Sequence, residues 1–407
     1  MTAQSTIKKR WFYLAVGVFA MLFSGILYAW SILKIPFKEV FLWDDGALAL
    51  NFTLTMCFFC LGAFGGSILG KKCGVRLALI TAGVLVGAGF TITGFLNSKG
   101  LVLLYISYGV LAASGIGISY NVIVSTVTAW FPDKKGLCSG CLMMGFGIST
   151  LLLGNLIGIL FESERIGFQN TYRLLAAVIG LVLIGAAFIL KRPRPETVFP
   201  QPKGQKSAPK EVSEPKNLTT VQMLKSFTFW KIFVCMIFIT AVGNSVISFA
   251  RDLVISVGAA QTLATTLVGV LAVCNGLGRV ITGAVYDALG RKVTMIASNA
   301  VTIVAAAVTL VAVVAGSLPV CIAGLCLAGI SYGSSPTVTS ACSASFFGPK
   351  HFPMNYSIMN FNLIAASLIA NVSNRLLITS GAYIASFVML LVLAVLALGL
   401  NFTINEP

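Results

Sequence analysis

Long apolar runs recur along the whole chain, separated by short polar turns. A helix needs about 20 mainly apolar residues to cross a bilayer, and each run reaches that length. The runs lie near residues 11–33, 47–70, 76–96, 101–130, 136–161, 171–190, 229–250, 261–287, 293–315, 318–346, 353–377 and 382–403. A β-barrel would instead show segments of about ten residues that alternate in polarity. The pattern therefore predicts an all-α integral membrane protein with twelve transmembrane helices.

Composition excludes a water-soluble fold for the chain as a whole. Of its 407 residues, 57% are hydrophobic and 10% are charged, whereas an ordinary soluble domain has about a quarter charged residues. The first run follows the basic residues 8–10 and resembles a secretory signal, but it is longer than the apolar core of a signal. We expect residues 11–33 to remain as a membrane helix.

The net charge of +16 has a topological explanation. Basic clusters lie on alternate loops, and by the positive-inside rule these loops face the cytoplasm. The clusters are residues 8–10, 71–76, 134–135, the stretch 191–231, 291–292 and Lys350. The pattern predicts a multi-pass protein of the inner or plasma membrane with both termini in the cytoplasm. It predicts no nucleic-acid partner, although the basic surface also suits anionic membrane lipid.

A polar segment divides the runs into two groups of six. Residues 191–225 hold six of the thirteen prolines and eight of the twenty-eight basic residues, a composition typical of a linker. We predict an N-terminal six-helix bundle at 1–190, a cytoplasmic linker at 191–227 and a C-terminal six-helix bundle at 228–407. Parallel repeats of this kind are common in transporters.

Two loops recur at a constant offset of 216 residues, which indicates a duplicated unit. Residues 70–76 read G-K-K-C-G-V-R and residues 286–292 read Y-D-A-L-G-R-K. Residues 131–135 read F-P-D-K-K and residues 347–351 read F-G-P-K-H. The two halves are therefore predicted to be pseudo-symmetric.

One of these loops resembles a known family motif. The string G-x-x-x-D-x-x-G-R-K, with Asp287, Gly290 and Arg291, resembles the loop motif of the major facilitator superfamily. The resemblance implies the major facilitator fold and a gating role for these residues. In the N-terminal half the corresponding loop has Lys71 and Arg76, and Lys71 stands where the other copy has Asp287. The same gating role is expected there without the carboxylate.

The cysteines predict neither disulfides nor a metal site. Most of the ten lie inside apolar runs or at their cytoplasmic ends, where thiols stay reduced. The chain has one histidine, His351, and the paired cysteine spacings are also those of helix neighbours. We expect no metal and no cofactor.

Arg279 is the one charged residue that lies deep inside an apolar run. An arginine at that depth costs at least about 2.5–3.5 kcal/mol. Asp287 lies eight residues on, which is about 12 Å along a helix and too far for a contact. Hydrogen bonds to helix carbonyls would give Arg279 a structural role, whereas a carboxylate substrate would pair with it directly. Asn275, one turn earlier, adds a polar group on the same helix face.

Further polar and aromatic residues occur at similar depth and are candidates for the substrate site. Each alone is also typical of helix packing or of the membrane interface. They are Tyr28, Trp30, Tyr120, Phe146, Tyr332, Tyr356 and Asn360.

Several short strings make the family resemblance narrower. R-W-F-Y-L at 10–14, G-I-L-Y-A-W at 25–30, W-F-P-D-K-K-G at 130–136, N-G-L-G-R at 275–279 and N-Y at 355–356 resemble the oxalate/formate antiporter family, which is related to monocarboxylate transporters. The resemblance covers nearly the whole chain. It implies that Arg279 binds the substrate and that Tyr28, Tyr120 and Tyr332 line the cavity.

Two departures from that family bear on the substrate. Its oxalate exchangers carry a lysine seven residues after the tyrosine of N-Y, and here that position is Leu363. An aromatic residue of the family is replaced by Asn360. One buried positive charge suits a monocarboxylate such as lactate, formate or acetate better than oxalate, although oxalate/formate exchange remains an alternative.

The same residues favour exchange or coupled transport. Without substrate, a closed transporter would bury the charge of Arg279 unpaired, at a cost of several kcal/mol. The apolar runs contain no aspartate, glutamate or histidine in their middle to relay protons, and Asn275 stands where monocarboxylate transporters often have aspartate. An exporter of hydrophobic compounds is a second hypothesis. An enzyme or sensor is not expected, because the chain has no catalytic motif and no room for a signalling domain. We expect a monomer.

Overall fold

A computed structural model describes residues 3–194, 196–197, 199, 217–380 and 383–404. Within these ranges the regular secondary structure is helical, and no strand is present. It forms two compact units, which we describe separately. Unit 1 contains residues 1–133 and 145–201, and unit 2 contains residues 134–144 and 202–407.

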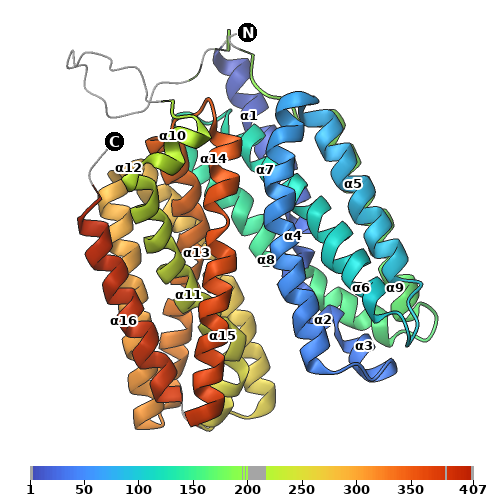
Figure 1. Ribbon diagram of the computed structural model, residues 1–407, viewed down its shortest axis with the longest axis vertical. Helices are drawn as coiled ribbons and strands as arrows, with labels where there is room; N and C mark the ends of the chain where they lie inside the picture. Colours follow the sequence, from blue (N-terminus) through green and yellow to red (C-terminus); the bar gives the residue numbers. More distant parts are fainter. Residues whose placement is uncertain (1–2, 195, 198, 200–216, 381–382, 405–407) are drawn as a thin grey trace. The chain divides into compact units, whose positions relative to one another are not determined.

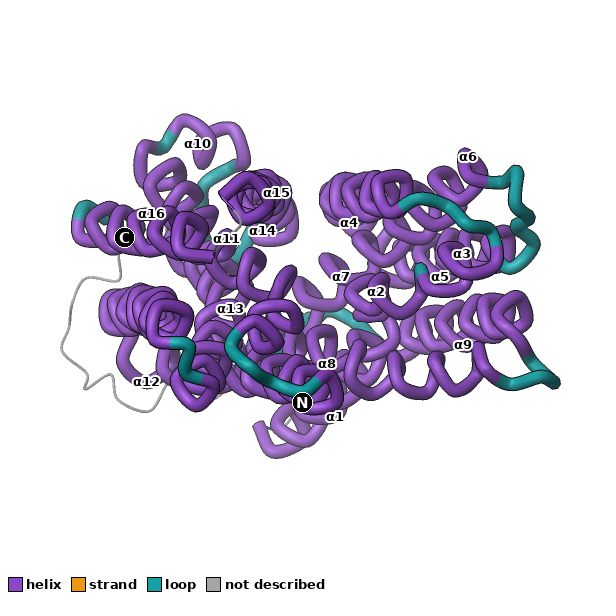
Figure 2. The backbone as a smooth tube through the Cα atoms, turned by 90° about the horizontal axis from the view of Figure 1, so that it is seen from below, coloured by secondary structure: helices purple, strands orange, loops and turns teal. Residues whose placement is uncertain are grey.

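Unit 1 is a bundle of long helices with short irregular segments between them (Figure 1). Its elements are α1 (Ala3–Ser24), η1 (Gly25–Ala29), α2 (Trp30–Leu33), α3 (Ile35–Val40), α4 (Asp45–Lys72), α5 (Gly74–Thr93), α6 (Leu101–Leu104), η2 (Tyr105–Ala112), α7 (Ala113–Thr128) and α9 (Gly167–Ile189). Figure 2, which looks along the helices, shows α5 beside α9. Helix α8 (Lys135–Glu162) begins in unit 2 and continues in unit 1.

Unit 2 is a second helical bundle. Its elements are α10 (Thr220–Lys225), α11 (Phe227–Ser256), α12 (Gln261–Ala315), α13 (Leu318–Phe346), α14 (Phe352–Met359), α15 (Asn362–Ser380) and α16 (Tyr383–Phe402). Helix α12 packs along α13 and α16, and α11 packs along α15 and α16 (Figure 1). Buried apolar side chains from α11, α12, α13 and α16 form the core of this bundle.

The predicted membrane spans correspond to helices of the structure. In the described part of the chain, ten helices are long and apolar enough to cross a membrane. One of them, residues 266–315, is 50 residues long and turns at Gly290, whose φ of 78° and ψ of −178° are not helical. The whole helix, α12, runs from Gln261 to Ala315 and therefore contains the two predicted spans 261–287 and 293–315. The predicted span 353–377 is divided between α14 and α15 by a break at residues 360–361.

Two predicted spans of unit 1 are less regular than their apolar pattern suggests. The first contains the 3-10 segment η1, and the fourth contains the π-helical segment η2. At η1, a Cβ on Gly25 would collide with the backbone carbonyl of Phe146, so glycine allows α8 to approach there. π-helical turns are rare and occur often at functional sites.

Both duplicated loops have a glycine at positive φ. Gly74 and Gly290, which are 216 residues apart, have φ values of 85° and 78°. Only glycine adopts this region at little cost, which explains why both copies of the loop have glycine there. The predicted boundaries 1–190, 191–227 and 228–407 stay a prediction, because residues 200–216 of the linker lie outside the described residues.

Candidate functional site

Arg279 lies in α12 with its side chain almost fully buried, at 2% exposed. Its Nε donates a hydrogen bond to Oδ1 of Asn275 over 3.1 Å. A second guanidinium nitrogen, Nη1, donates to the backbone carbonyl of Met143 in α8. Among the described residues, Arg279 has no carboxylate partner. Its charge is therefore held by two neutral oxygen atoms.

Close helix contacts bring these groups together. A Cβ added to Gly140 of α8 would collide with the carbonyl of Arg279, and one added to Gly333 of α13 would collide with the carbonyl of Asn275. Thr337 of α13 donates a hydrogen bond to the Arg279 carbonyl over 3.2 Å. Glycines at contacts between membrane helices allow such approach. Both neighbouring helices thus reach α12 at the level of Arg279.

Asn275 is placed to contribute to a ligand site as well. Its side chain is 8% exposed, and its oxygen accepts the bond from Arg279. In the described residues its amide nitrogen has no acceptor, and this atom is not among the fully buried unpaired ones. The two N–H groups of Asn275 are therefore available to an anion beside the guanidinium.

Asp287 lies two turns further along α12 and binds the first turn of α8. Its two carboxylate oxygens accept hydrogen bonds from the backbone N–H groups of Gly136 over 2.8 Å and of Leu137 over 2.7 Å. A carboxylate at a helix N-terminus compensates free N–H groups and the helix dipole. Asp287 was expected to lie too far from Arg279 for a contact, and in the structure its carboxylate binds α8 instead.

The other predicted gating residues have different surroundings. Arg291 is 9% exposed, and its Nη2 donates to the carbonyl of Ile404 over 3.2 Å. In unit 1, Lys71 is exposed, and the guanidinium of Arg76 lies 4.1 Å from the ring centre of Phe188. Their gating role stays a prediction.

Three of the predicted aromatic residues form one cluster in unit 1. The rings of Tyr28 and Phe146 are 5.4 Å apart, and those of Tyr120 and Phe146 are 5.1 Å apart. Phe59 completes the cluster at 5.2 Å from Tyr120. Phe59 was not among the predicted residues, because a phenylalanine in an apolar run has no distinguishing signal. Tyr28 is half-buried, and its hydroxyl has no hydrogen-bond partner among the described residues.

Trp30 belongs to a different cluster, although it is only two residues from Tyr28. Its ring lies 4.7 Å from that of Tyr108 and 6.3 Å from that of Phe37. The side chain is 5% exposed and packs among buried rings. The structure thus separates Trp30 from the cluster of Tyr28, Tyr120 and Phe146.

The remaining candidates lie in unit 2. Tyr332 of α13 is 5% exposed, and its ring lies where a Cβ on Gly243 of α11 would be. Tyr356 of α14 is fully buried and stacks on Phe352 with a centroid distance of 5.3 Å. Asn360 is buried at the break between α14 and α15. Tyr356 and Asn360 are joined through their backbones by a 3.0 Å hydrogen bond.

Residues 130–133 of the motif at 130–136 have a structural function within unit 1. The carboxylate of Asp133 binds the guanidinium of Arg10 over 2.7 Å, with both side chains less than a tenth exposed. Trp130 donates its indole N–H to the carbonyl of Lys191 over 2.7 Å. Two of the strings that carried the family resemblance, at 10–14 and 130–136, thus meet at this ion pair.

Among the described residues, side chains that bind metals do not cluster. All ten cysteines are free. Within the described ranges, no group of three or more histidine, cysteine, aspartate or glutamate side chains is close enough to hold a metal ion. The polar groups of the site are instead a guanidinium, an amide and hydroxyls, which bind anions and neutral polar groups.

Twelve predicted spans, the two helical units and the duplicated loops define a polytopic membrane transporter. The family model of the Major Facilitator Superfamily matches residues 12–256 and 233–407. The chain therefore belongs to the Major Facilitator Superfamily, which confirms the fold class and the resemblance inferred from its motifs. Proteins of this family are membrane transporters rather than enzymes.

Relatives make the resemblance more specific. The chain is 29% identical to the oxalate:formate antiporter of Oxalobacter formigenes over 359 residues, which cover 87% of this chain and 82% of the relative. It is 23% identical to monocarboxylate transporter 12 of Homo sapiens over 383 residues, covering 88% and 73% of the two chains. Both relatives are named for organic anions.

Solved structures share the fold at low sequence identity. The proton:xylose symporter XylE aligns with a TM-score of 0.76 at 13% identity, covering 100% of this chain and 97% of that chain. The Escherichia coli fucose:proton symporter FucP aligns with a TM-score of 0.72 at 13% identity, covering 97% and 98%. At such identity these structures bear on the fold alone.

Proposed function

We propose that this protein transports a small monocarboxylate, such as lactate, formate or acetate, across the cell membrane. The observation that carries the proposal is Arg279, a buried guanidinium without a carboxylate partner among the described residues. A guanidinium binds a carboxylate through two parallel hydrogen bonds. The names of the two relatives, an oxalate:formate antiporter and a monocarboxylate transporter, support this class of substrate.

The hydrogen bonds of Arg279 suggest how substrate binding favours closure of the transporter. The Met143 carbonyl accepts a hydrogen bond from Nη1 of the guanidinium, and a neutral carbonyl stabilises this charge less than a carboxylate does. A bound carboxylate takes the place of the carbonyl and lowers the cost of burying the charge. The closed state is then reached mainly with substrate bound, and transport proceeds by alternating access as an antiporter or coupled carrier.

A single positive charge supports a monocarboxylate over oxalate. Leu363, at the start of α15, stands where the oxalate exchangers of the resembling family have lysine. A dianion would bring a second carboxylate without a matching cation, which is costly in a poorly solvated site. The similarity to the oxalate:formate antiporter keeps oxalate/formate exchange as a second candidate.

Charge distribution supports an orientation for the transporter. The basic loops, including residues 71–76 and 134–135, would face the cytoplasm. Both termini would then be cytoplasmic, in an inner or plasma membrane. We further propose that the protein acts as a monomer, since the family resemblance places a complete substrate site in one chain.

The test is uptake of labelled lactate, formate, acetate and oxalate by proteoliposomes that contain the purified protein. Arg279→Ala should abolish uptake of the transported monocarboxylate. Arg279→Lys should retain a small part, because lysine keeps the charge but not the paired hydrogen bonds. Arg251→Ala is the matched control, since Arg251 is an exposed arginine near the end of α11.

Folding is checked by the melting temperature and gel-filtration profile of each variant. Uptake that is unchanged in both Arg279 variants would rule out the role of Arg279 in substrate binding. Uptake of oxalate at a rate equal to that of formate would favour the second candidate. Uptake of hydrophobic compounds but of no carboxylate would contradict the proposal altogether.

A further inference from the structure

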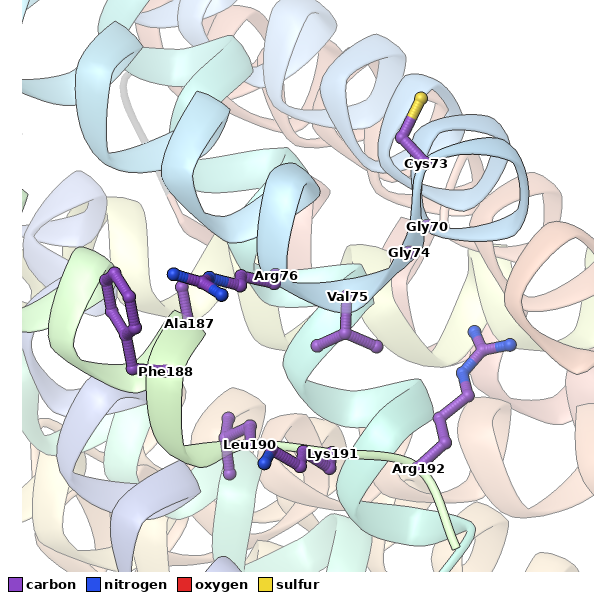
Figure 3. Close-up of a pocket in the computed structure, with 10 residues that line it drawn as sticks. All are labelled: Gly70, Cys73, Gly74, Val75, Arg76, Ala187, Phe188, Leu190, Lys191 and Arg192. Carbon is purple, nitrogen blue, oxygen red and sulfur yellow. The ribbon is translucent and has the colours of Figure 1, made fainter. Parts of the chain in front are cut away.

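A cavity of about 560 Å3 lies in unit 1, where the end of α4, the start of α5 and the end of α9 meet. Figure 3 shows Arg76 and Lys191 on one side of Val75 and Arg192 on the other. The glycines 70 and 74 at its wall carry no side chains that would fill it. Its size is that of an ordinary small-ligand site.

The charged groups of this cavity are all positive. Its lining includes Arg76, Lys191 and Arg192 and no acidic residue. In the part of the chain that the structure describes, none of these three forms an ion pair. Three cations without counter-charges repel one another and attract an anion into a concave site. Guanidinium groups bind phosphate oxygens in the same paired geometry that they use for carboxylates.

The loop between α4 and α5 supplies this cavity with no carboxylate. In the C-terminal half, Asp287 supplies a carboxylate three residues before Gly290, and it binds backbone N–H groups of α8. In the N-terminal half the equivalent position is Lys71, which is exposed. The loop has kept its glycine at 74 and its basic residues but offers no internal anion.

Apolar side chains continue outward from the cavity. Leu77 and Val84 on α5, and Leu181 and Phe188 on α9, are 53–69% exposed. Each pair is seven residues apart and so lies on one face of its helix. The ring of Phe188 contacts the guanidinium of Arg76, which places this apolar surface next to the charged cavity.

We propose that this cavity binds the phosphate head group of an anionic phospholipid, whose acyl chains lie along the exposed faces of α5 and α9. Basic pockets between helices at the cytoplasmic side of a membrane are suited to such head groups. A free phosphate can contact only the three cations, whereas a phospholipid also gains apolar contacts along α5 and α9 and should therefore bind more tightly. The lipid site is separate from Arg279 and does not depend on which substrate is carried.

Cys73 provides a direct readout, because it lines the cavity and is the exposed member of the ten cysteines. The full-length protein in neutral detergent is treated with a maleimide, and the labelling rate of the Cys73 peptide is followed by mass spectrometry. Phosphatidylglycerol should slow this labelling about fivefold when most sites are filled. Phosphatidylcholine with the same acyl chains, and inorganic phosphate at equal concentration, should leave the rate unchanged.

The double variant Lys191→Gln/Arg192→Gln should lose the protection by phosphatidylglycerol. The matched control is Lys71→Gln/Lys72→Gln, which removes the same charge from exposed residues at the end of α4 that do not line the cavity, and it should keep the protection. Equal protection by both lipids, or equal loss in the two double variants, would overturn the proposal. Protection by inorganic phosphate alone would assign the cavity to a soluble anion and overturn the lipid site.

Discussion

Nε of Arg279 donates a hydrogen bond to Oδ1 of Asn275 over 3.1 Å, one helical turn earlier in α12. This hydrogen bond fixes the orientation of the Nε side of the guanidinium along α12. Nη1 of the same guanidinium donates a hydrogen bond to the Met143 carbonyl. The hydrogen bond to Asn275 can be removed by mutation, because Asn275 accepts it with its side chain. The bond to the Met143 carbonyl cannot be removed in this way, because the acceptor belongs to the backbone.

Asn275→Asp should weaken substrate binding. The new carboxylate would lie at the 3.1 Å position of the amide oxygen and form an ion pair with Arg279. A substrate carboxylate must then displace it and suffer repulsion from it, so we expect the KM for the monocarboxylate to rise about tenfold or more. Concentration-dependent uptake in proteoliposomes measures this change.

The control for that experiment is Asn275→Ala, which removes the acceptor without adding charge. It should raise KM less than Asn275→Asp does, because Arg279 keeps its full positive charge. An unchanged KM in Asn275→Asp would show that the substrate does not bind beside this residue.

Leu363→Lys should extend transport to oxalate. A lysine at this position supplies the second cation that a dianion requires, and an ion pair in a poorly solvated site discriminates strongly between one and two negative charges. Oxalate uptake should rise at least about fivefold while uptake of the monocarboxylate falls. Leu363→Met, which is similarly long but uncharged, should resemble the parent. A Leu363→Lys variant that stays folded and active on the monocarboxylate but gains no oxalate uptake would contradict the charge argument.

Asp287→Ala should destabilise the start of α8. The N–H groups of Gly136 and Leu137 lose acceptors at 2.8 and 2.7 Å, and hydrogen bonds to a charged group contribute about 1.5–3 kcal/mol. The melting temperature should fall, and Asp287→Asn should show a smaller loss because one oxygen remains. Lys71→Ala, at the equivalent position of the other half, should change stability little. Equal melting temperatures for Asp287→Ala and the parent would contradict the capping role.

Gly140→Ala should lower both stability and transport. The added methyl group would collide with the carbonyl of Arg279, and overpacking of this kind costs about 1–3 kcal/mol. Gly158→Ala is a control in the same helix, since no atom lies within 4 Å of the added Cβ. It should leave stability unchanged or raise it, because alanine favours a helix by about 1 kcal/mol over glycine. Comparable melting temperatures for the two variants would argue against close packing of α8 on α12.

Hydropathy determined where the helices run but not how regular they are. The predicted span 318–346 has the same bounds as α13, and the predicted span 136–161 lies within one residue of α8 at each end. In contrast, the π-helical segment η2 and the break at residues 360–361 lie inside apolar runs. Irregular backbone inside a helix depends on contacts with neighbouring helices, so the apolar pattern does not predict it.

The candidate site was predictable only where a residue is chemically exceptional. Arg279 stands out because a charge in an apolar run is expensive, and the face shared with Asn275 follows from helical spacing. The Met143 carbonyl that binds Arg279 has no sequence signal, because every residue has a carbonyl. The separation of Tyr28 from Trp30 is decided by the rings that pack against each of them, Phe146 and Tyr108.

The amino-acid sequence by itself determined a twelve-span membrane transporter with one cation deep inside an apolar run, because burying a charge and spanning a bilayer both impose strict limits on composition. Tertiary structure decided which groups stabilise that cation, which carboxylate binds the start of α8, and that three basic residues share a cavity. These outcomes depend on helix packing, and many sequences with the same apolar pattern would pack differently.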